Sequence, residues 1–203
     1  MRSVVPLEGS PALVVVDMQR LFGDSSSPWA TPGFDQIVKP IDDLVAAFDA
    51  AKTVFTRFVI PERWDGSWVP YYSEWKAVTT AGARPLMDLV EPWASRGPRT
   101  LDRTTFSKWG PELRRAAGQS RTLILCGVAT DCCVIATALP AADAGMFVRV
   151  VADACRGATP EAHASALAVM RNFAPQIEIT TVAEELTRLV APPAERPPPD
   201  ASA

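Results

Sequence analysis

Histidine is almost absent from this sequence, whose 203 residues include only His163. Histidine is the usual base beside a nucleophilic thiol and the commonest metal ligand. His163 lies in TPEAHASALAVMRNF, where apolar residues recur at intervals of three and four, so we expect it on a helix face without a chemical role. This scarcity argues against a Cys-His dyad.

Excess positive charge and long apolar runs are also absent. Lys and Arg total 20 against 23 Asp and Glu, a formal charge of -3, which favours neither nucleic acid nor anionic membrane as a partner. No stretch approaches the roughly 18 apolar residues of a spanning helix, and the N-terminus lacks the features of a signal peptide. We therefore expect a cytoplasmic protein that binds no nucleic acid and no membrane.

Cysteine pairs with the spacing of zinc or thioredoxin sites are missing too. The four cysteines are Cys126, Cys132, Cys133 and Cys155, all in or beside apolar segments. Neither a CxxC motif nor the spread of a disulfide scaffold is present. We expect reduced thiols.

What the chain does contain is a regular alternation of two patterns. Runs rich in β-branched residues predict strands at 12–16, 53–58, 99–103, 121–126, 146–151 and 176–180. Segments of helical period lie between and after them, at 34–51, 84–95, 110–118, 130–145, 159–174 and 182–191. This order predicts an α/β protein with a three-layer, doubly wound, Rossmann-like fold around a six-stranded parallel sheet.

Two segments depart from that alternation. Residues 191–203 are rich in proline without apolar periodicity, so we expect a disordered tail after a single domain spanning 1–190. Residues 59–80 form a long connection after the second strand and contain three tryptophans and two tyrosines. A loop this long is more often functional than idle, and it could be pocket, lid or subunit interface.

Polar side chains follow three of the predicted strands. Asp17 follows the first strand, Arg103 and Lys108 follow the third, and the sequence GVATDCC follows the fourth. Ligands of open parallel sheets bind outside the carboxyl ends of the strands, near the point where strand order reverses. A carboxylate, a cation and a thiol are therefore expected to converge there.

Cys133 is the thiol best placed to react. It falls in the first turn of a helix starting near Asp131, where free backbone N–H groups favour a thiolate and can hold an oxyanion. Asp131 is interpreted as the N-cap of that helix. Cys132 points about 100° away around the turn, so we expect only one of the two thiols to face the site. With no suitable histidine, Asp17 is the remaining base.

Three motifs resemble the isochorismatase-like cysteine hydrolases, which include nicotinamidases, N-carbamoylsarcosine amidohydrolases and ureidoacrylate amidohydrolases. The motifs are LVVVDMQ, TLDRTTFSKW and GVATDCCVIATALPAADAGMFVRVVADA, and the resemblance covers residues 11 to about 182. It implies that Asp17 and Cys133 are catalytic, that the Val128–Ala129 peptide is cis, and that the amides of Ala129 and Cys133 form the oxyanion hole.

The sequence departs from the family pattern at the third catalytic residue. In the family a lysine stands three residues before an aromatic residue and four before a serine, and here Arg103 takes that position. Arginine cannot shuttle a proton, but it can hold a carboxylate and a thiolate in place. We favour Arg103 as the third catalytic residue. Lys108 is the alternative, expected in the following helix and able to substitute if the loop bends back.

A second departure concerns the metal. Nicotinamidases carry an aspartate and histidines as metal ligands after the second strand, and this stretch has no histidine here, so we expect no metal or other cofactor. Aromatic residues indicate an apolar or ring-bearing pocket instead. Substrate contacts are expected from Phe22, Trp29, Trp64, Phe106 and Val128.

Together these features predict a hydrolase that cleaves an amide or related C–N bond of a small molecule through a thioester. One alternative is an isochorismatase-type vinyl-ether hydrolase, which needs the aspartate as acid and no thiol. Another is a binding protein of the same fold that has lost turnover, which the arginine at the lysine position would suit. Since relatives are commonly dimers or larger, we also expect a homo-oligomer.

Overall fold

A parallel sheet of six strands forms the centre of the computed structural model, which describes residues 10–190. The strands are β1 (Ala12–Val16), β2 (Thr53–Phe58), β3 (Thr100–Arg103), β4 (Thr122–Val128), β5 (Phe147–Arg156) and β6 (Ile177–Thr180). Their order is β3-β2-β1-β4-β5-β6, and every neighbouring pair is parallel. The predicted α/β fold is confirmed, and each predicted strand overlaps an observed one.

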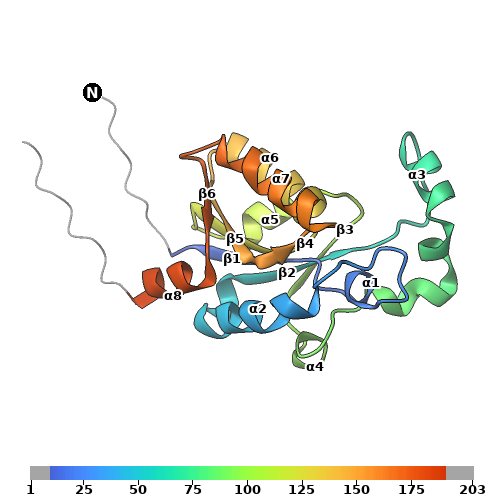
Figure 1. Cartoon of the computed structure of the whole chain (residues 1–203), viewed down its shortest axis with the longest axis horizontal. Coiled ribbons are helices and arrows are strands. Elements are labelled where there is room, and N and C mark those ends of the chain that lie inside the picture. The colour runs from blue at the N-terminus through green and yellow to red at the C-terminus, as the bar shows by residue number, and fades with distance from the viewer. Residues whose placement is uncertain (1–9, 191–203) are drawn as a thin grey trace, which may run out of the picture.

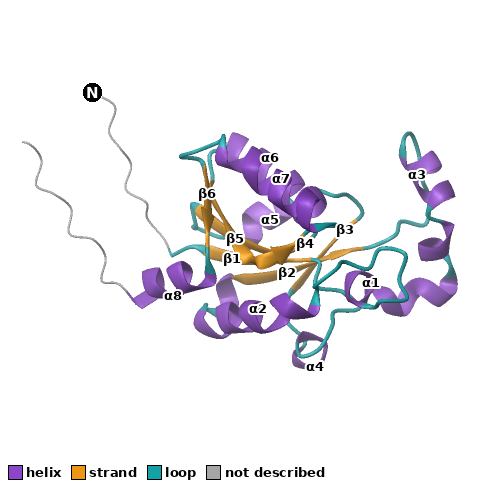
Figure 2. Cartoon of the chain, in the orientation of Figure 1, coloured by secondary structure: helices purple, strands orange, loops and turns teal. Residues whose placement is uncertain are grey.

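Helices cover both faces of the sheet (Figures 1 and 2). One face carries α2 (Asp35–Ala47), α4 (Trp93–Arg96) and α8 (Val182–Val190), and the other carries α5 (Pro111–Ala116), α6 (Ile135–Asp143) and α7 (Pro160–Arg171). The short α1 (Arg20–Gly23) and α3 (Trp68–Glu74) lie beyond one end of the sheet. The remaining turns are the 3-10 helices η1 (Ala50–Lys52), η2 (Lys76–Thr79) and η3 (Ala81–Met87), and the π-helical η4 (Thr130–Val134).

Burial explains why the central strands read as unbroken apolar runs. All five residues of β1 are buried, because helices pack on both faces of this strand. The apolar side of α2, formed by Ile37, Ile41 and Leu44, is fully buried over the sheet. Each such side chain contributes roughly 1.5–3 kcal/mol when it leaves water.

The helix predicted over 84–95 is wrong. The chain instead forms η3 up to Met87 and then the four-residue α4 from Trp93. Pro85 lies inside η3 and Pro92 directly precedes α4. Proline lacks the N–H that a continuous α-helix needs and clashes with the preceding turn, so two prolines in this stretch disfavour a single helix.

The predicted tail at 191–203 lies outside the described residues.

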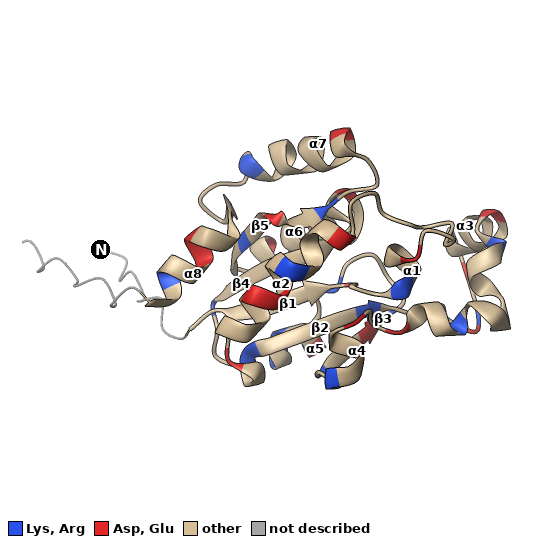
Figure 3. Ribbon diagram, turned by 60° about the horizontal axis from the view of Figure 1, so that its bottom comes forward, with Lys and Arg blue, Asp and Glu red and all other residues tan. Residues whose placement is uncertain are grey.

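Within residues 10–190, no helix combines the length and the apolar character that crossing a membrane requires. Helices α2, α7 and α8 each carry charges of both signs (Figure 3).

Strand order reverses between β1 and β4, because β1 pairs with β2 on one side and with β4 on the other. Gly127 permits the close approach at the end of β4. Its φ is +110°, and a Cβ atom built there would lie 2.0 Å from the carbonyl oxygen of Val16. The reversal brings the residues after β1 and β4 to one edge of the sheet, where the candidate site lies.

Candidate active site

Asp17 directly follows β1 and is completely buried. Its backbone has φ 51°, in the left-handed region that non-glycine residues rarely adopt. Thr56 of β2 donates a hydrogen bond of 2.7 Å to Asp17 Oδ1 and accepts one of 3.2 Å from the Asp17 N–H. This reciprocal pair fixes the carboxylate at the end of the strand and leaves Oδ2 for another partner.

Lys108 is that partner. Its Nζ lies 2.8 Å from Asp17 Oδ2, and both side chains are fully buried. The ammonium also donates to the Thr105 carbonyl at 3.1 Å and lies 4.8 Å from the centre of the Phe58 ring. Among the described residues, Asp17 Oδ2 has no further partner.

Arg103, the cation favoured from the sequence, does not reach Asp17. It stands at the end of the edge strand β3 and pairs with Glu112 of α5. Since β2 lies between β3 and β1, neighbouring strands about 4.8 Å apart put Asp17 roughly 10 Å away across the sheet. The chain after β3 instead bends back over the end of β2, and Lys108 lies in this loop and not in the next helix. Lys108, the alternative to Arg103 in the sequence analysis, is therefore the cation that contacts Asp17.

Cys133 lies in η4, between β4 and α6, and is 3% exposed. Thr137 ties it to the loop that carries Lys108. The Thr137 hydroxyl accepts a hydrogen bond of 2.8 Å from the Lys108 N–H and donates one of 2.7 Å to the Cys133 carbonyl. Thus one buried hydroxyl connects the backbone of Cys133 to the backbone of Lys108.

The turn that carries Cys133 is also held from the other side. The interpretation of Asp131 as the N-cap of its helix is wrong: its Oδ1 accepts a hydrogen bond of 2.9 Å from the Ala158 N–H in the loop after β5. The chain enters η4 through Ala129 in an extended conformation, so Asp131 already lies inside the turn. His163 of α7 shares a hydrogen bond of 2.8 Å with the fully buried Thr130 hydroxyl. His163 therefore has a structural partner.

The two adjacent thiols influence each other. The pKa of Cys133 is raised by the hydrogen bond with Cys132, by burial and by the Asp17 carboxylate, while Lys108 lowers it. The pKa of Cys132 is lowered, chiefly by the same hydrogen bond. Both residues line one cavity, although we expected only one of the two thiols to face the site. A buried Cys133 with a raised pKa needs a base to become a thiolate.

The cavity beside the thiols has a volume of about 420 Å³, and six of its thirteen lining residues are aromatic. Phe22, Trp29 and Phe106 line it, as the sequence led us to expect. Phe58, Tyr71 and Trp75 also line the cavity. None of the three was among the expected substrate contacts, although Tyr71 was one of the aromatic residues that indicated a ring-bearing pocket. The complete lining is Phe22, Pro28, Trp29, Ala30, Thr31, Phe58, Tyr71, Trp75, Phe106, Ala129, Cys132, Cys133 and Ala158.

Two expected substrate contacts do not lie in this cavity. Trp64 lines a different hollow, and its ring packs 5.0 Å from that of Tyr72. Val128 belongs to β4 and is fully buried, because its side chain packs in the core. The peptide bond that follows it, Val128–Ala129, is cis, and Ala129 lines the cavity.

Comparison with known proteins shows the family of this chain. Residues 11–184, most of the chain, match the isochorismatase domain family. The chain belongs to the isochorismatase family. This family is that of the isochorismatase-like hydrolases, and membership in it is consistent with amide hydrolysis.

Individual members of the isochorismatase family are similar over different lengths. Isochorismatase domain-containing protein 2 of Rattus norvegicus is 36% identical over 86 residues, which are 41% of this chain and 40% of that protein. A cysteine hydrolase from Pseudomonas syringae shares the fold, with a TM-score of 0.72, 24% identity, and coverage of 92% of this chain and 98% of that one. A pyrazinamidase of Pyrococcus horikoshii, solved in complex with zinc, has a TM-score of 0.63, 27% identity, and coverage of 85% and 99%.

This isochorismatase-family chain does not fit the metal site of the nicotinamidases. The connection after β2 has no histidine, and within residues 10–190 no three His, Cys, Asp or Glu side chains are grouped to hold a metal ion. The candidate site is therefore described by its protein groups alone.

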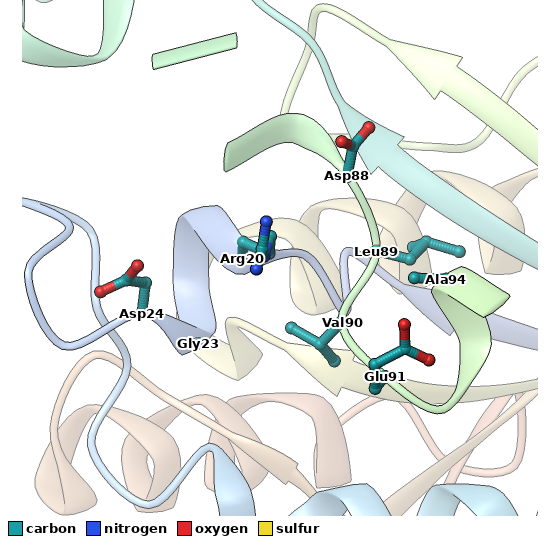
Figure 4. Close-up of a pocket in the computed structure, with 8 residues that line it drawn as sticks. All are labelled: Arg20, Gly23, Asp24, Asp88, Leu89, Val90, Glu91 and Ala94. Carbon is teal, nitrogen blue, oxygen red and sulfur yellow. The ribbon is translucent and has the colours of Figure 1, made fainter. Parts of the chain in front are cut away.

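A second, slightly larger cavity of about 440 Å³ lies between α1 and the chain before α4 (Figure 4). Arg20 sits there between Asp24 on one side and Asp88 and Glu91 on the other. It contains no thiol and no residue predicted for the site. Chemistry, rather than volume, selects the cavity beside Cys133 as the candidate active site.

Proposed function

We propose that this protein is a cysteine-dependent hydrolase that cleaves an amide or related C–N bond of a small molecule through a thioester. The observation that carries the proposal is the buried Lys108–Asp17 ion pair, with the Lys108 backbone linked through Thr137 to the backbone of Cys133, a buried cysteine that lines a cavity. Asp17, Lys108 and Cys133 are the proposed catalytic residues. Each belongs to a different loop at the carboxyl ends of the strands, which is where such sites form.

Asp17 acts as the base. Because the resting Cys133 thiol has a raised pKa, its proton must leave as the substrate binds. Asp17 Oδ2 contacts only Lys108 among the described groups, so it can accept this proton, while Thr56 holds Oδ1. Lys108 keeps the carboxylate in place and stabilises the thiolate that forms.

The thiolate then attacks the carbonyl carbon, and the backbone amides of Ala129 and Cys133 donate to the tetrahedral oxyanion. Collapse of this intermediate breaks the C–N bond, and Asp17 returns its proton to the departing amine. Water, deprotonated by Asp17, hydrolyses the thioester and releases the acid. The free thiol is restored with its proton.

Turnover of a panel of amides, followed by ammonia release, tests this proposal. We expect Cys133→Ser to lower kcat/KM by at least about 1,000-fold, since removal of a nucleophile typically costs that much or more. Acid-quenched wild-type enzyme should carry the acyl group on Cys133 in intact mass spectra. Cys126→Ala, which removes a fully buried thiol away from the cavity, is the matched control and should keep turnover within about threefold.

Retention of more than a few per cent of turnover by Cys133→Ser would contradict the covalent mechanism. If Cys133→Ala remained active while Asp17→Asn did not, an acid-only reaction of the vinyl-ether type would replace it. Absence of both turnover and acyl-enzyme across the panel would favour a binding protein.

A further inference from the structure

We infer that the ligand of the Cys133 cavity is an uncharged amide with an apolar, ring-sized acyl group. The inference rests on the proposed function for the reaction, and on the walls of the cavity for the ligand class. It goes beyond the hydrolase assignment because it selects among amides by charge and polarity.

Aromatic rings form a continuous wall around the cavity. Trp29 is in contact with four of them: its ring centre lies 6.2 Å from that of Phe22, 5.6 Å from Phe58, 5.9 Å from Tyr71 and 6.0 Å from Trp75. Phe106 continues the wall, at 6.2 Å from Phe58 and 5.6 Å from Tyr71. Such a wall favours flat or compact apolar groups over extended polar ones.

Charge is missing from the same wall. Among the described residues that line the cavity, none is Asp, Glu, Lys, Arg or His. The Asp17 and Lys108 side chains behind it are fully buried and neutralise each other. A carboxylate or ammonium group on the ligand would leave water without meeting an opposite charge, which is strongly unfavourable.

The polar groups on the wall are neutral. Burial raises the pKa of Tyr71, so its hydroxyl stays protonated. The other polar side-chain groups of the lining residues are the Thr31 hydroxyl, the two thiols and the indole N–H groups of Trp29 and Trp75. The volume of about 420 Å³ lies at the small end of the range for small-molecule sites. A ligand with one or two rings, or an alkyl chain of similar bulk, fits these limits.

Amides matched in length test the inference. Hexanamide, adipamate and 6-aminohexanamide share one carbon chain and differ only in a terminal methyl, carboxylate or ammonium group, and phenylacetamide adds a ring. We expect kcat/KM for hexanamide and phenylacetamide to exceed that for either charged amide by at least about 100-fold. Higher kcat/KM for adipamate or 6-aminohexanamide would overturn the inference and leave the proposed hydrolase function intact.

If no amide is turned over, measurements of ligand affinity distinguish the inference about the ligand from the proposed hydrolase function. In Cys133→Ala protein, quenching of tryptophan fluorescence should report phenylacetamide binding with a Kd at least 10-fold lower than that for adipamate or 6-aminohexanamide. Selective binding without turnover would support the inference and contradict the hydrolase. Equal or reversed affinities would overturn the inference whatever the activity.

A charge placed on the wall provides the converse test. Trp75→Arg should raise the ratio of adipamate to hexanamide, in kcat/KM or in affinity, by at least about 10-fold. Val69→Arg, which adds the same charge at an exposed position of α3, should leave the ratio unchanged. Thr31→Lys repeats the test on a different segment should Trp75→Arg not fold, and an unchanged ratio in both wall variants would contradict the inference.

Discussion

Lys108 Nζ and Asp17 Oδ2 form a fully buried ion pair at 2.8 Å, although the two residues follow different strands. Removing both charges from water is costly, and the pair persists because Thr56, Thr105 and the Phe58 ring supply further contacts. The pair therefore constrains both the fold around the site and the chemistry that we propose.

The first prediction concerns this pair. Lys108→Met leaves the Asp17 carboxylate buried without its partner, so the free energy of unfolding should fall by about 3–5 kcal/mol. It should also lower kcat/KM by at least about 100-fold. Urea denaturation measures the first effect, and amide turnover measures the second. The double variant Asp17→Asn/Lys108→Met should be less destabilised than the sum of its single variants.

Arg103→Met is the matched control for that prediction. Its partner Glu112 is about half exposed, and ion pairs of this kind contribute about 0–1 kcal/mol. Activity should stay within about threefold of wild type. If Arg103→Met abolished turnover and Lys108→Met did not, the third catalytic residue would be Arg103 after all.

Thr137→Val tests the link between the thiol and the Lys108 loop. The variant keeps the side-chain shape and removes both hydrogen bonds of the hydroxyl, so it should destabilise the fold by about 1–3 kcal/mol and lower kcat. Thr187→Val removes a similar bond, from Thr187 Oγ1 to the carbonyl four residues earlier, on exposed α8. Comparable kcat values in the two variants would mean that the Thr137 link does not matter for catalysis.

Gly127→Ala tests the close approach of β4 to β1. The added Cβ atom would lie 2.0 Å from the Val16 carbonyl oxygen at φ +110°, so we expect a loss of more than about 4 kcal/mol, or no folded protein. Gly118→Ala also has a positive φ, +60°, but meets nothing within 4 Å, and should lose only about 1–2 kcal/mol. Thermal and urea denaturation compare the two. Equal losses would show that backbone conformation, and not the contact with Val16, makes glycine necessary.

His163 should make stability depend on pH. Burial, assisted by the positive charge of Arg156, lowers the pKa of His163 below 6.5, while Asp131 opposes the shift. Below pH 6.5 the unfolded chain therefore binds the proton more readily than the folded chain. The free energy of unfolding should fall as the pH drops from 7.5 to 5.5, and level off below the folded pKa.

His163→Gln removes this titration. Urea denaturation at pH 7.5, 6.5 and 5.5 should show the stability advantage of wild type over His163→Gln shrinking toward low pH. An advantage that grew as the pH fell would mean that the folded protein binds the proton more tightly, with the sign of the shift reversed.

The parts of the fold that the sequence predicted are those set by local pattern. Continuous apolar runs such as ALVVV predicted buried strands, and helical spacing predicted α2 and α7, because the covered faces repeat along the chain. The strand-end rule then placed Asp17 and Cys133 at one edge of the sheet. The helix predicted over 84–95 does not form, because its two prolines disfavour a continuous helix in spite of the apolar spacing.

Local pattern could not predict which cation contacts Asp17 or which aromatic residues line the cavity. The resemblance to the family pattern favoured Arg103, but β2 separates the end of β3 from Asp17, and the loop after β3 brings Lys108 to Asp17 instead. Trp64 and Tyr71 occur in the same aromatic connection, and only Tyr71 lines the Cys133 cavity. Asp131 caps nothing in its own turn and binds Ala158, which is distant in sequence.

The sequence by itself determined the α/β class, the six strands, and the position of a strand-end aspartate and a cysteine after another strand at one edge of the sheet. Periodicity and turn chemistry act between near neighbours, so they can be read from order alone. Only the tertiary structure decided that Lys108 contacts Asp17 and that both Cys132 and Cys133 line the cavity. It also decided that the described residues of the cavity wall include six aromatic residues and no charged one. Those outcomes depend on where loops fold back over the sheet, which is settled by packing between residues far apart in the chain.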